Sequence, residues 1–290
     1  MKKFLLIFLF GFIHYSIFSQ IQEFHSVEDG FLRLKASSLQ TGKFKLVSPD
    51  TGDIIYLIGV IHIGEKSYYE KINVFSKDMD VLFYEGVSFS TQKLSNTKHS
   101  ILQNIAQVAN KQTNFKEILK YQESFAKKVS LARQVDELIP EYNWVNADVN
   151  YAEFQNILKK HEISQHKMMN YLSLDNKNTF QNYNEIENMD ETNPVFIKKI
   201  KEYKKIIASN LVTSANDLCF SEKMKLARKI LILERNKVAL SFVQKRLNQK
   251  NPQIIGMLYG AAHIPDFLNI LQKEYGFIID SHEWLDAWNL

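Results

Sequence analysis

The amino-acid sequence predicts an α/β protein with one central mixed sheet. Apolar runs typical of buried strands lie near both ends of the chain, whereas a helical pattern dominates the residues between them, from about 91 to 250. The same short motif, Gly-x-x-His, follows an apolar run in each end segment. We therefore expect the N- and C-terminal segments to build the sheet together and the large helical middle to form a cap over it.

The first twenty residues have the order of a secretory signal peptide. A pair of lysines precedes an almost unbroken apolar stretch, and the small Ser19 follows it. Because this stretch is short for a membrane span, we expect it to be cleaved, with an uncleaved membrane anchor as the alternative. The prediction is an exported protein, periplasmic or extracellular, with a signal peptide at 1–20 and a single domain at 21–290.

The composition excludes several classes of protein. Hydrophobic residues make up 45% of the chain and charged residues 23%, as in globular rather than disordered proteins. Without the two lysines of the signal peptide, 34 basic residues face 32 acidic ones, and a net charge of +2 predicts no nucleic-acid partner. The single cysteine, Cys219, can form no internal disulfide and belongs to no cysteine-rich zinc site.

The N-terminal segment predicts an antiparallel start to the sheet. Short strand patterns occupy Phe31–Lys35 and Lys43–Val47, and the turn residues Ser48–Asp53 lead into a buried strand at Ile54–Ile61. A helical spacing over Glu65–Phe75 then precedes another apolar run at 80–84. A strand, a helix and a second strand in this order are typical of a parallel pair.

The remaining elements follow the same reasoning. A helical pattern runs from 91 to about 138, and an extended segment at 143–148 precedes a helix that begins near Asn150. The stretch from 173 to 193 is rich in Asn and Asp and predicts a loop or insertion. The chain then predicts a strand at 253–258, a helix at 264–275 and a last strand at 277–280.

The two Gly-x-x-His motifs supply the first candidate site residues. His62 and His263 each follow a buried strand, three residues after Gly59 and Gly260. α/β proteins bind ligands at the carboxyl ends of their strands, so two histidines in this context could meet in one pocket. The alternative for each is a hydrogen-bonded structural histidine beside a glycine bulge, but the repeated context favours function.

Acidic and basic candidates accompany the histidines. Glu85 ends the strand that follows the His62 strand, and its aromatic neighbours predict a raised pKa, as a general acid or base requires. Asp148 precedes a helix, where a helix cap is the slightly favoured interpretation over a site residue. Arg235 lies in an apolar helical run and could hold a carboxylate, stabilise an oxyanion or form a structural ion pair.

These segments resemble the TraB/PrgY/GumN family, which includes the TIKI proteins and is related to the erythromycin-esterase and haem-uptake ChaN-like groups. The resemblance rests on the two Gly-x-x-His motifs, Glu85 and Glu234-Arg235-Asn236, and spans roughly 43–281. It implies a sheet built from both end segments and a common site of His62, Glu85, His263 and, in support, Arg235. One departure is Pro265-Asp266 after the second motif, where the family often has a glycine.

The resemblance implies two chemistries that the sequence leaves open. A TIKI-like peptidase would bind a divalent metal of the Mn, Co or Zn type through His62, Glu85 and His263 and activate water. A related esterase would use a histidine base without metal. The expected function is hydrolysis of a peptide or small ester by activated water; a non-catalytic haem- or metal-binding protein and an inactive family member are the alternatives.

Overall fold

The computed structural model describes residues 31–86, 122–164, 167–168, 194–249 and 251–290. The expected signal peptide at 1–20, the greater part of the helical stretch from 91 to 138, and the polar stretch at 173–193 lie outside these residues. Among the described helices, none has the length and apolar character needed to cross a membrane.

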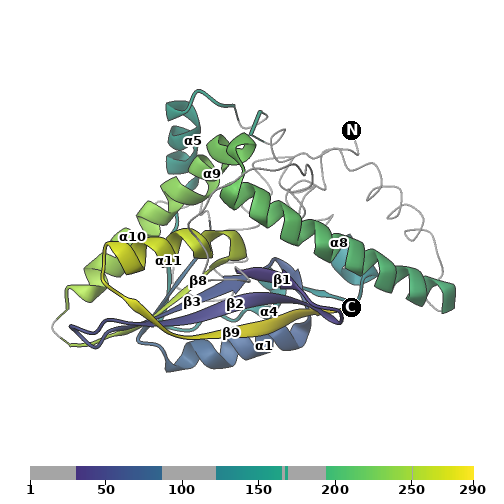
Figure 1. Ribbon diagram of the computed structural model, residues 1–290, viewed down its shortest axis with the longest axis horizontal. Helices are drawn as coiled ribbons and strands as arrows, with labels where there is room; N and C mark the ends of the chain where they lie inside the picture. Colours follow the sequence, from purple (N-terminus) through teal and green to yellow (C-terminus); the bar gives the residue numbers. More distant parts are fainter. Residues whose placement is uncertain (1–30, 87–121, 165–166, 169–193, 250) are drawn as a thin grey trace.

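The α/β prediction is confirmed: the described residues form a seven-stranded mixed sheet with helices on both faces (Figure 1). The strand order is β1-β2-β3-β8-β5-β7, and β9 pairs with the other edge of β2. The strands are β1 (Leu32–Leu34), β2 (Ser38–Val47), β3 (Ile54–Val60), β5 (Val81–Tyr84), β7 (Trp144–Asn146), β8 (Ile254–Gly260) and β9 (Ile278–Asn289). A small second sheet joins β4 (Ile63–Gly64) to β6 (Ala132–Arg133).

The sheet joins the two ends of the chain, as the sequence predicts. β1, β2 and β3 pair antiparallel, whereas β3, β8, β5 and β7 are all parallel. The central strands β3 and β8 are almost continuously apolar because both of their faces are covered. The sequence predicts β3 and β5 as a parallel pair. They are parallel, but they are not neighbours, because β8 lies between them.

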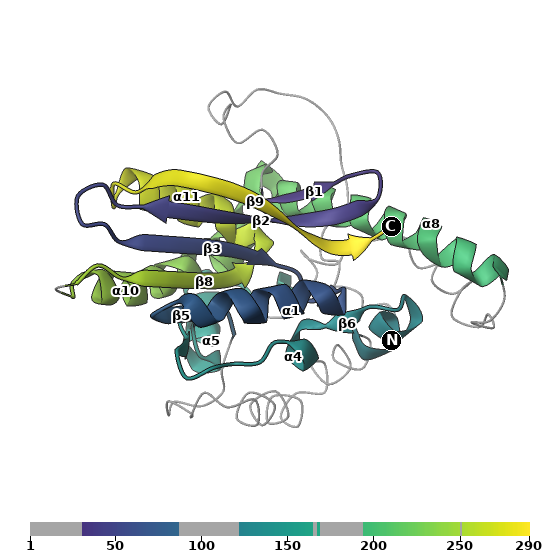
Figure 2. The ribbon, with the colours of Figure 1, turned by 90° about the horizontal axis from the view of Figure 1, so that it is seen from below.

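The helices cover the sheet in two layers. α1 (Lys66–Phe75) lies on one face, and α10 (Glu234–Leu247) and α11 (Ile264–Lys273) lie on the other, as Figures 1 and 2 show. The long α8 (Pro194–Phe220) contacts β1, and α9 (Lys225–Arg228) leads toward α10. Two further α-helices are α4 (Gln134–Glu137) and α5 (Tyr151–Lys160).

The last strand is three times as long as the sequence indicates. β9 runs from Ile278 to Asn289 and pairs along the whole of β2, whereas the apolar run predicts a strand of only four residues. The continuation carries Glu283 and Asp286, which hide the alternating pattern. Charged side chains are usual on an edge strand because one side of its backbone is open.

Candidate functional site

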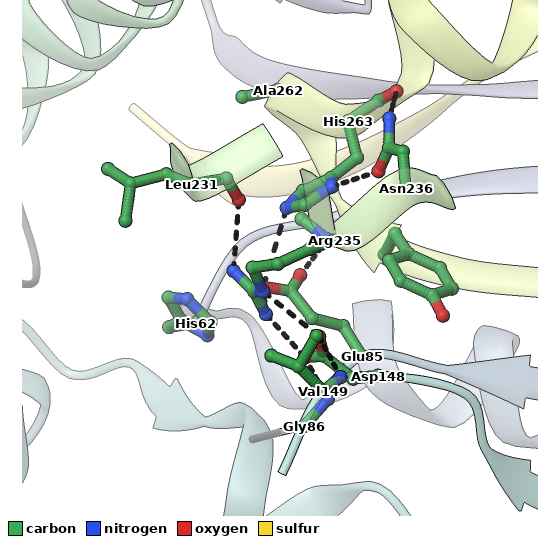
Figure 3. A network of polar contacts seen from close by, with 12 residues as sticks. His62, Glu85, Gly86, Asp148, Val149, Leu231, Arg235, Asn236, Ala262 and His263 are labelled. Carbon is green, nitrogen blue, oxygen red and sulfur yellow. Dashed lines mark hydrogen bonds and ion pairs between the residues drawn. The ribbon is translucent and has the colours of Figure 1, made fainter. Parts of the chain in front are cut away.

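Four strand ends bring the candidate residues to one edge of the sheet. His62 follows β3, Glu85 follows β5, Asp148 follows β7 and His263 follows β8. These four strands are parallel neighbours, so their carboxyl ends share an edge. Arg235 reaches the same edge from α10 (Figure 3).

Arg235 binds two carboxylates at once. Its Nη2 donates to Oε1 of Glu85 at 2.7 Å and also to Asp148, and its Nε donates to Oδ1 of Asp148 at 3.0 Å. Nη1 donates to the carbonyl oxygen of Leu231 at 3.2 Å. Four of the five guanidinium hydrogens are therefore engaged, and the side chain is only 11% exposed. Arg235 thus forms ion pairs with two carboxylates of the chain itself.

A π-helical turn at Lys229–Leu233 precedes Arg235. A π-turn widens the helix and leaves a carbonyl group without its usual partner, a feature often found at functional sites. Here Leu231, within that turn, accepts from the Arg235 side chain. The turn therefore helps to orient the guanidinium toward the sheet edge.

Asp148 is not a helix cap, and the interpretation favoured from the sequence is wrong. The N-cap of α5 is Asn150, which exchanges hydrogen bonds with Glu153 in a capping box. The Asp148 side chain is fully buried and, besides Arg235, accepts from the backbone N–H groups of Gly86 and Val149. Each of its oxygens thus accepts one hydrogen bond from Arg235 and one from the backbone, and the carboxylate is held beside the guanidinium.

His263 is buried and held from both sides. It lies in a 3-10 turn, Ala261–His263, before α11, and is 3% exposed. Nδ1 lies 2.5 Å from Oδ1 of Asn236, and Nε2 lies 3.5 Å from Oε1 of Glu85. The ring therefore bridges Asn236 and Glu85 (Figure 3).

Gly260 permits the close approach that its motif suggests. Its N–H donates to Oε2 of Glu85 at 2.6 Å, and a Cβ at this position would stand 3.0 Å from the same oxygen. A larger residue here would press against the carboxylate and push it back by a few tenths of an ångström. The two motifs are not equivalent, however, because Val60 rather than Gly59 lies beside Gly260 in the sheet.

His62 is the exposed member of the set. Its Nδ1 lies 2.9 Å from Oε1 of Gln134, whose backbone N–H donates to the His62 carbonyl oxygen at 2.8 Å. Tyr69 also donates to the carbonyl oxygen of Ile61 at 2.8 Å and anchors the loop from α1. In Figure 3 His62 stands outside the bonded network, although it is close enough to Glu85 to help lower the pKa of that carboxyl when the imidazole is protonated.

The pKa of Glu85 is lowered, and the raised value expected from its aromatic neighbours is wrong. Burial alone would raise the pKa of this carboxyl, but the charges of Arg235 and His263 hold it well below the usual range. His62 contributes in the same direction. Glu85 is therefore a permanently ionised group near neutral pH, suited to orient and stabilise cations rather than to donate a proton.

The Glu85 pKa predicts a loss of stability in acid. Because the folded-state pKa lies below the ordinary value of about 4.5, the stabilisation is complete above that pH and is lost as the pH falls below it. Urea unfolding at a series of pH values should show a smaller decline below about pH 4.5 in Glu85→Gln than in the parent protein. Glu283→Gln, which removes an exposed partner of Lys43, is the control and should leave the decline unchanged.

The three expected metal ligands do not form a ready metal site in this arrangement. Both oxygens of Glu85 already accept hydrogen bonds, and one donor is the Arg235 cation, which would repel a divalent ion. Nδ1 of His62 and Nδ1 of His263 each contact a carboxamide. Across the described ranges, no group of three or more His, Cys, Asp or Glu side chains is placed to hold a metal ion.

Sequence reasoning did not single out three residues of the site. Asn236 and Asp266 stand out only as parts of motifs in the sequence, and Gln134 lies in a stretch that predicts simply a helix. Asn236 contacts His263 and Asp266, and Gln134 contacts His62. Asn236 carried a usable signal, since a buried amide in an apolar helix requires a partner.

Comparison of the chain with models of protein families and with curated proteins gives no match.

Proposed function

We propose that this chain is an exported hydrolase of the TraB/GumN (TIKI-like) type that cleaves a peptide or small ester by activated water. The observation that carries the proposal is an exposed imidazole, His62, near a buried carboxylate at the carboxyl edge of parallel strands. That edge is where α/β folds place their reactive groups. The arrangement supports the metal-independent form of this chemistry.

His62 is the proposed general base. With its Nδ1 hydrogen donated to Gln134, Nε2 carries a lone pair, and within the described part of the chain no hydrogen bond engages it. Nε2 takes a proton from water as the oxygen attacks the carbonyl carbon. It then returns that proton to the departing amine or alcohol, so the same histidine acts first as the base and then as the acid.

Glu85 and Arg235 have supporting electrostatic roles. The negative charge of Glu85 acts on His62 and so stabilises the imidazolium that forms when water is deprotonated. Arg235 keeps Glu85 ionised, and the second Nη1 hydrogen, which has no partner among the described residues, is the proposed donor to a developing oxyanion. His263 contributes by fixing the other side of Glu85.

The test is a screen of purified protein against chromogenic esters and peptides, with and without a chelator. We expect turnover that the chelator leaves unchanged and that added Mn²⁺, Co²⁺ or Zn²⁺ does not raise, because Arg235 already supplies the positive charge at Glu85. Loss of turnover with chelator and recovery with one of these ions would favour the metal-dependent form instead.

Two outcomes of the same screen would contradict a hydrolase altogether. One is an absence of turnover together with stoichiometric haem binding, seen as a new absorbance band on addition of haem. The other is a complete absence of turnover on both substrate classes by protein shown to be folded. Either result would favour one of the non-catalytic alternatives.

A further inference from the structure

Asn236 lies at the centre of a buried chain of polar contacts that reaches Glu85. Its side chain is fully buried on α10. Oδ1 is 2.5 Å from Nδ1 of His263, while Nδ2 donates to Oδ2 of Asp266 at 2.9 Å and to the His263 carbonyl oxygen at 3.4 Å. Every polar group of this amide therefore has a partner.

Asp266 fixes which way the Asn236 amide points. A carboxylate and a carbonyl oxygen only accept hydrogen bonds, so the amide nitrogen must face Asp266 and the His263 carbonyl group. Rotating the amide by half a turn would place its oxygen against two acceptors. The amide oxygen must then face Nδ1 of His263, and that nitrogen must carry a hydrogen.

Glu85, in contrast, favours a hydrogen on Nε2 of His263. Its Oε1 lies 3.5 Å from Nε2 of His263, and a neutral ring free to choose would place its hydrogen on Nε2 to bond the carboxylate. The contact to Asn236 is a full ångström shorter than the contact to Glu85. The distances fit a ring whose hydrogen is on the Asn236 side.

We infer that Asn236, oriented by Asp266, is a positioning residue that holds the hydrogen of His263 on Nδ1. In the charged ring Nε2 also carries a hydrogen and faces Oε1 of Glu85; in the neutral ring the one hydrogen stays on Nδ1, and Oε1 of Glu85 keeps Arg235 as its partner. His62 has the same relation to Gln134, so each histidine meets a carboxamide at Nδ1. The effect on turnover rests on the proposed function, whereas the position of the hydrogen does not.

The first test is spectroscopic. Nitrogen NMR of protein labelled with ¹⁵N-histidine, recorded where the ring is neutral, distinguishes a ring nitrogen that carries hydrogen from one that does not. Comparison with His263→Gln assigns the signals. The parent protein should show hydrogen on Nδ1 of His263; hydrogen on Nε2 instead would overturn the inference.

Substitutions at Asp266 test how the hydrogen is held. Asp266→Ala removes the nearer of the two acceptors that orient the amide, so His263 should shift toward the form with hydrogen on Nε2. Asp266→Asn keeps an oxygen that can accept from Asn236 and should retain the parent form. An Asp266→Ala spectrum identical to that of the parent would contradict the role of Asp266.

Exchanging the side chains of Asn236 and Asp266 tests this pair without leaving a cavity where the Asn236 amide stood. Asn236→Asp alone sets two carboxylates against each other and should lower turnover by up to about 100-fold, the effect of displacing a site group by about an ångström. Adding Asp266→Asn restores an amide that donates to the new carboxylate and should recover most of the loss. Gln244→Ala, an exposed amide on the same helix, is the control and should change nothing.

The outcomes separate this inference from the proposed function. Suppose that the protein shows no turnover, but that His263 carries its hydrogen on Nδ1 in the parent and shifts in Asp266→Ala. The inference about Asn236 would then stand, and the proposed hydrolase function would be wrong. Turnover in a protein whose neutral His263 carries its hydrogen on Nε2 would do the reverse.

Discussion

Replacing Arg235 by methionine is expected to lower the free energy of unfolding by about 3–5 kcal/mol, the usual result of removing one partner from a buried ion pair. The arginine stands between Glu85 and Asp148, whose side chains are 16% and 0% exposed. Without the guanidinium, two negative charges would remain side by side in a poorly solvated site. Urea unfolding of the variant, followed by circular dichroism, measures the loss.

The control and the rescue follow from the same geometry. Lys237→Met removes a cation from the same helix, but that lysine is 67% exposed and pairs with Glu234 at 3.6 Å, so the loss should stay within about 1 kcal/mol. Adding Glu85→Gln and Asp148→Asn to Arg235→Met removes the unpaired charges and should recover part of the stability. A loss below about 1 kcal/mol in Arg235→Met itself would show that the three charges are not effectively buried.

The sheet was largely predictable because its central strands are buried on both faces. Such strands need near-continuous apolar runs, and β3, β5 and β8 have them. The order of the strands was not predictable to the same extent. The insertion of β8 between β3 and β5 depends on contacts between residues about 200 positions apart, which no local pattern encodes.

The candidate site, like the sheet, has features that the sequence predicts and features that it does not. His62, Glu85 and His263 could be predicted because each follows a buried strand, and parallel strands end at one edge. The pKa of Glu85 could not, since its direction depends on Arg235, a residue 150 positions later in the chain. The sequence favours a helix cap for Asp148 for a related reason. Its partner Arg235 is distant in the chain, whereas the helix that it would cap begins only a few residues later.

The two histidines differ in burial, and the difference alters what their replacement should do. The sequence suggests that either could be replaced by alanine without unfolding the protein. His263 is 3% exposed and contacts Asn236 and Glu85, so its removal would also disturb the buried network. A loss of activity in a His263 variant therefore needs a stability measurement beside it, whereas His62 offers the clean experiment.

His62→Ala should lower turnover by about 10²–10⁴-fold, the range that a positioned general base supplies. The free energy of unfolding should change by less than about 1 kcal/mol, because His62 is exposed and its side chain has one hydrogen-bond partner, Gln134, within the described residues. Steady-state kinetics on the best substrate of the screen, together with urea unfolding, gives both quantities. The loss should appear in kcat, since the proton transfer occurs in the transition state.

His282→Ala is the matched control for this experiment, because it removes another exposed histidine, on β9, which pairs with β2 rather than with the strands that carry the site. It should leave kcat unchanged. Gln134→Ala should fall between the two, since it keeps the His62 base but releases its Nδ1 hydrogen bond. If His62→Ala instead turned over at the parent rate, His62 would not be the base and the proposed mechanism would be wrong.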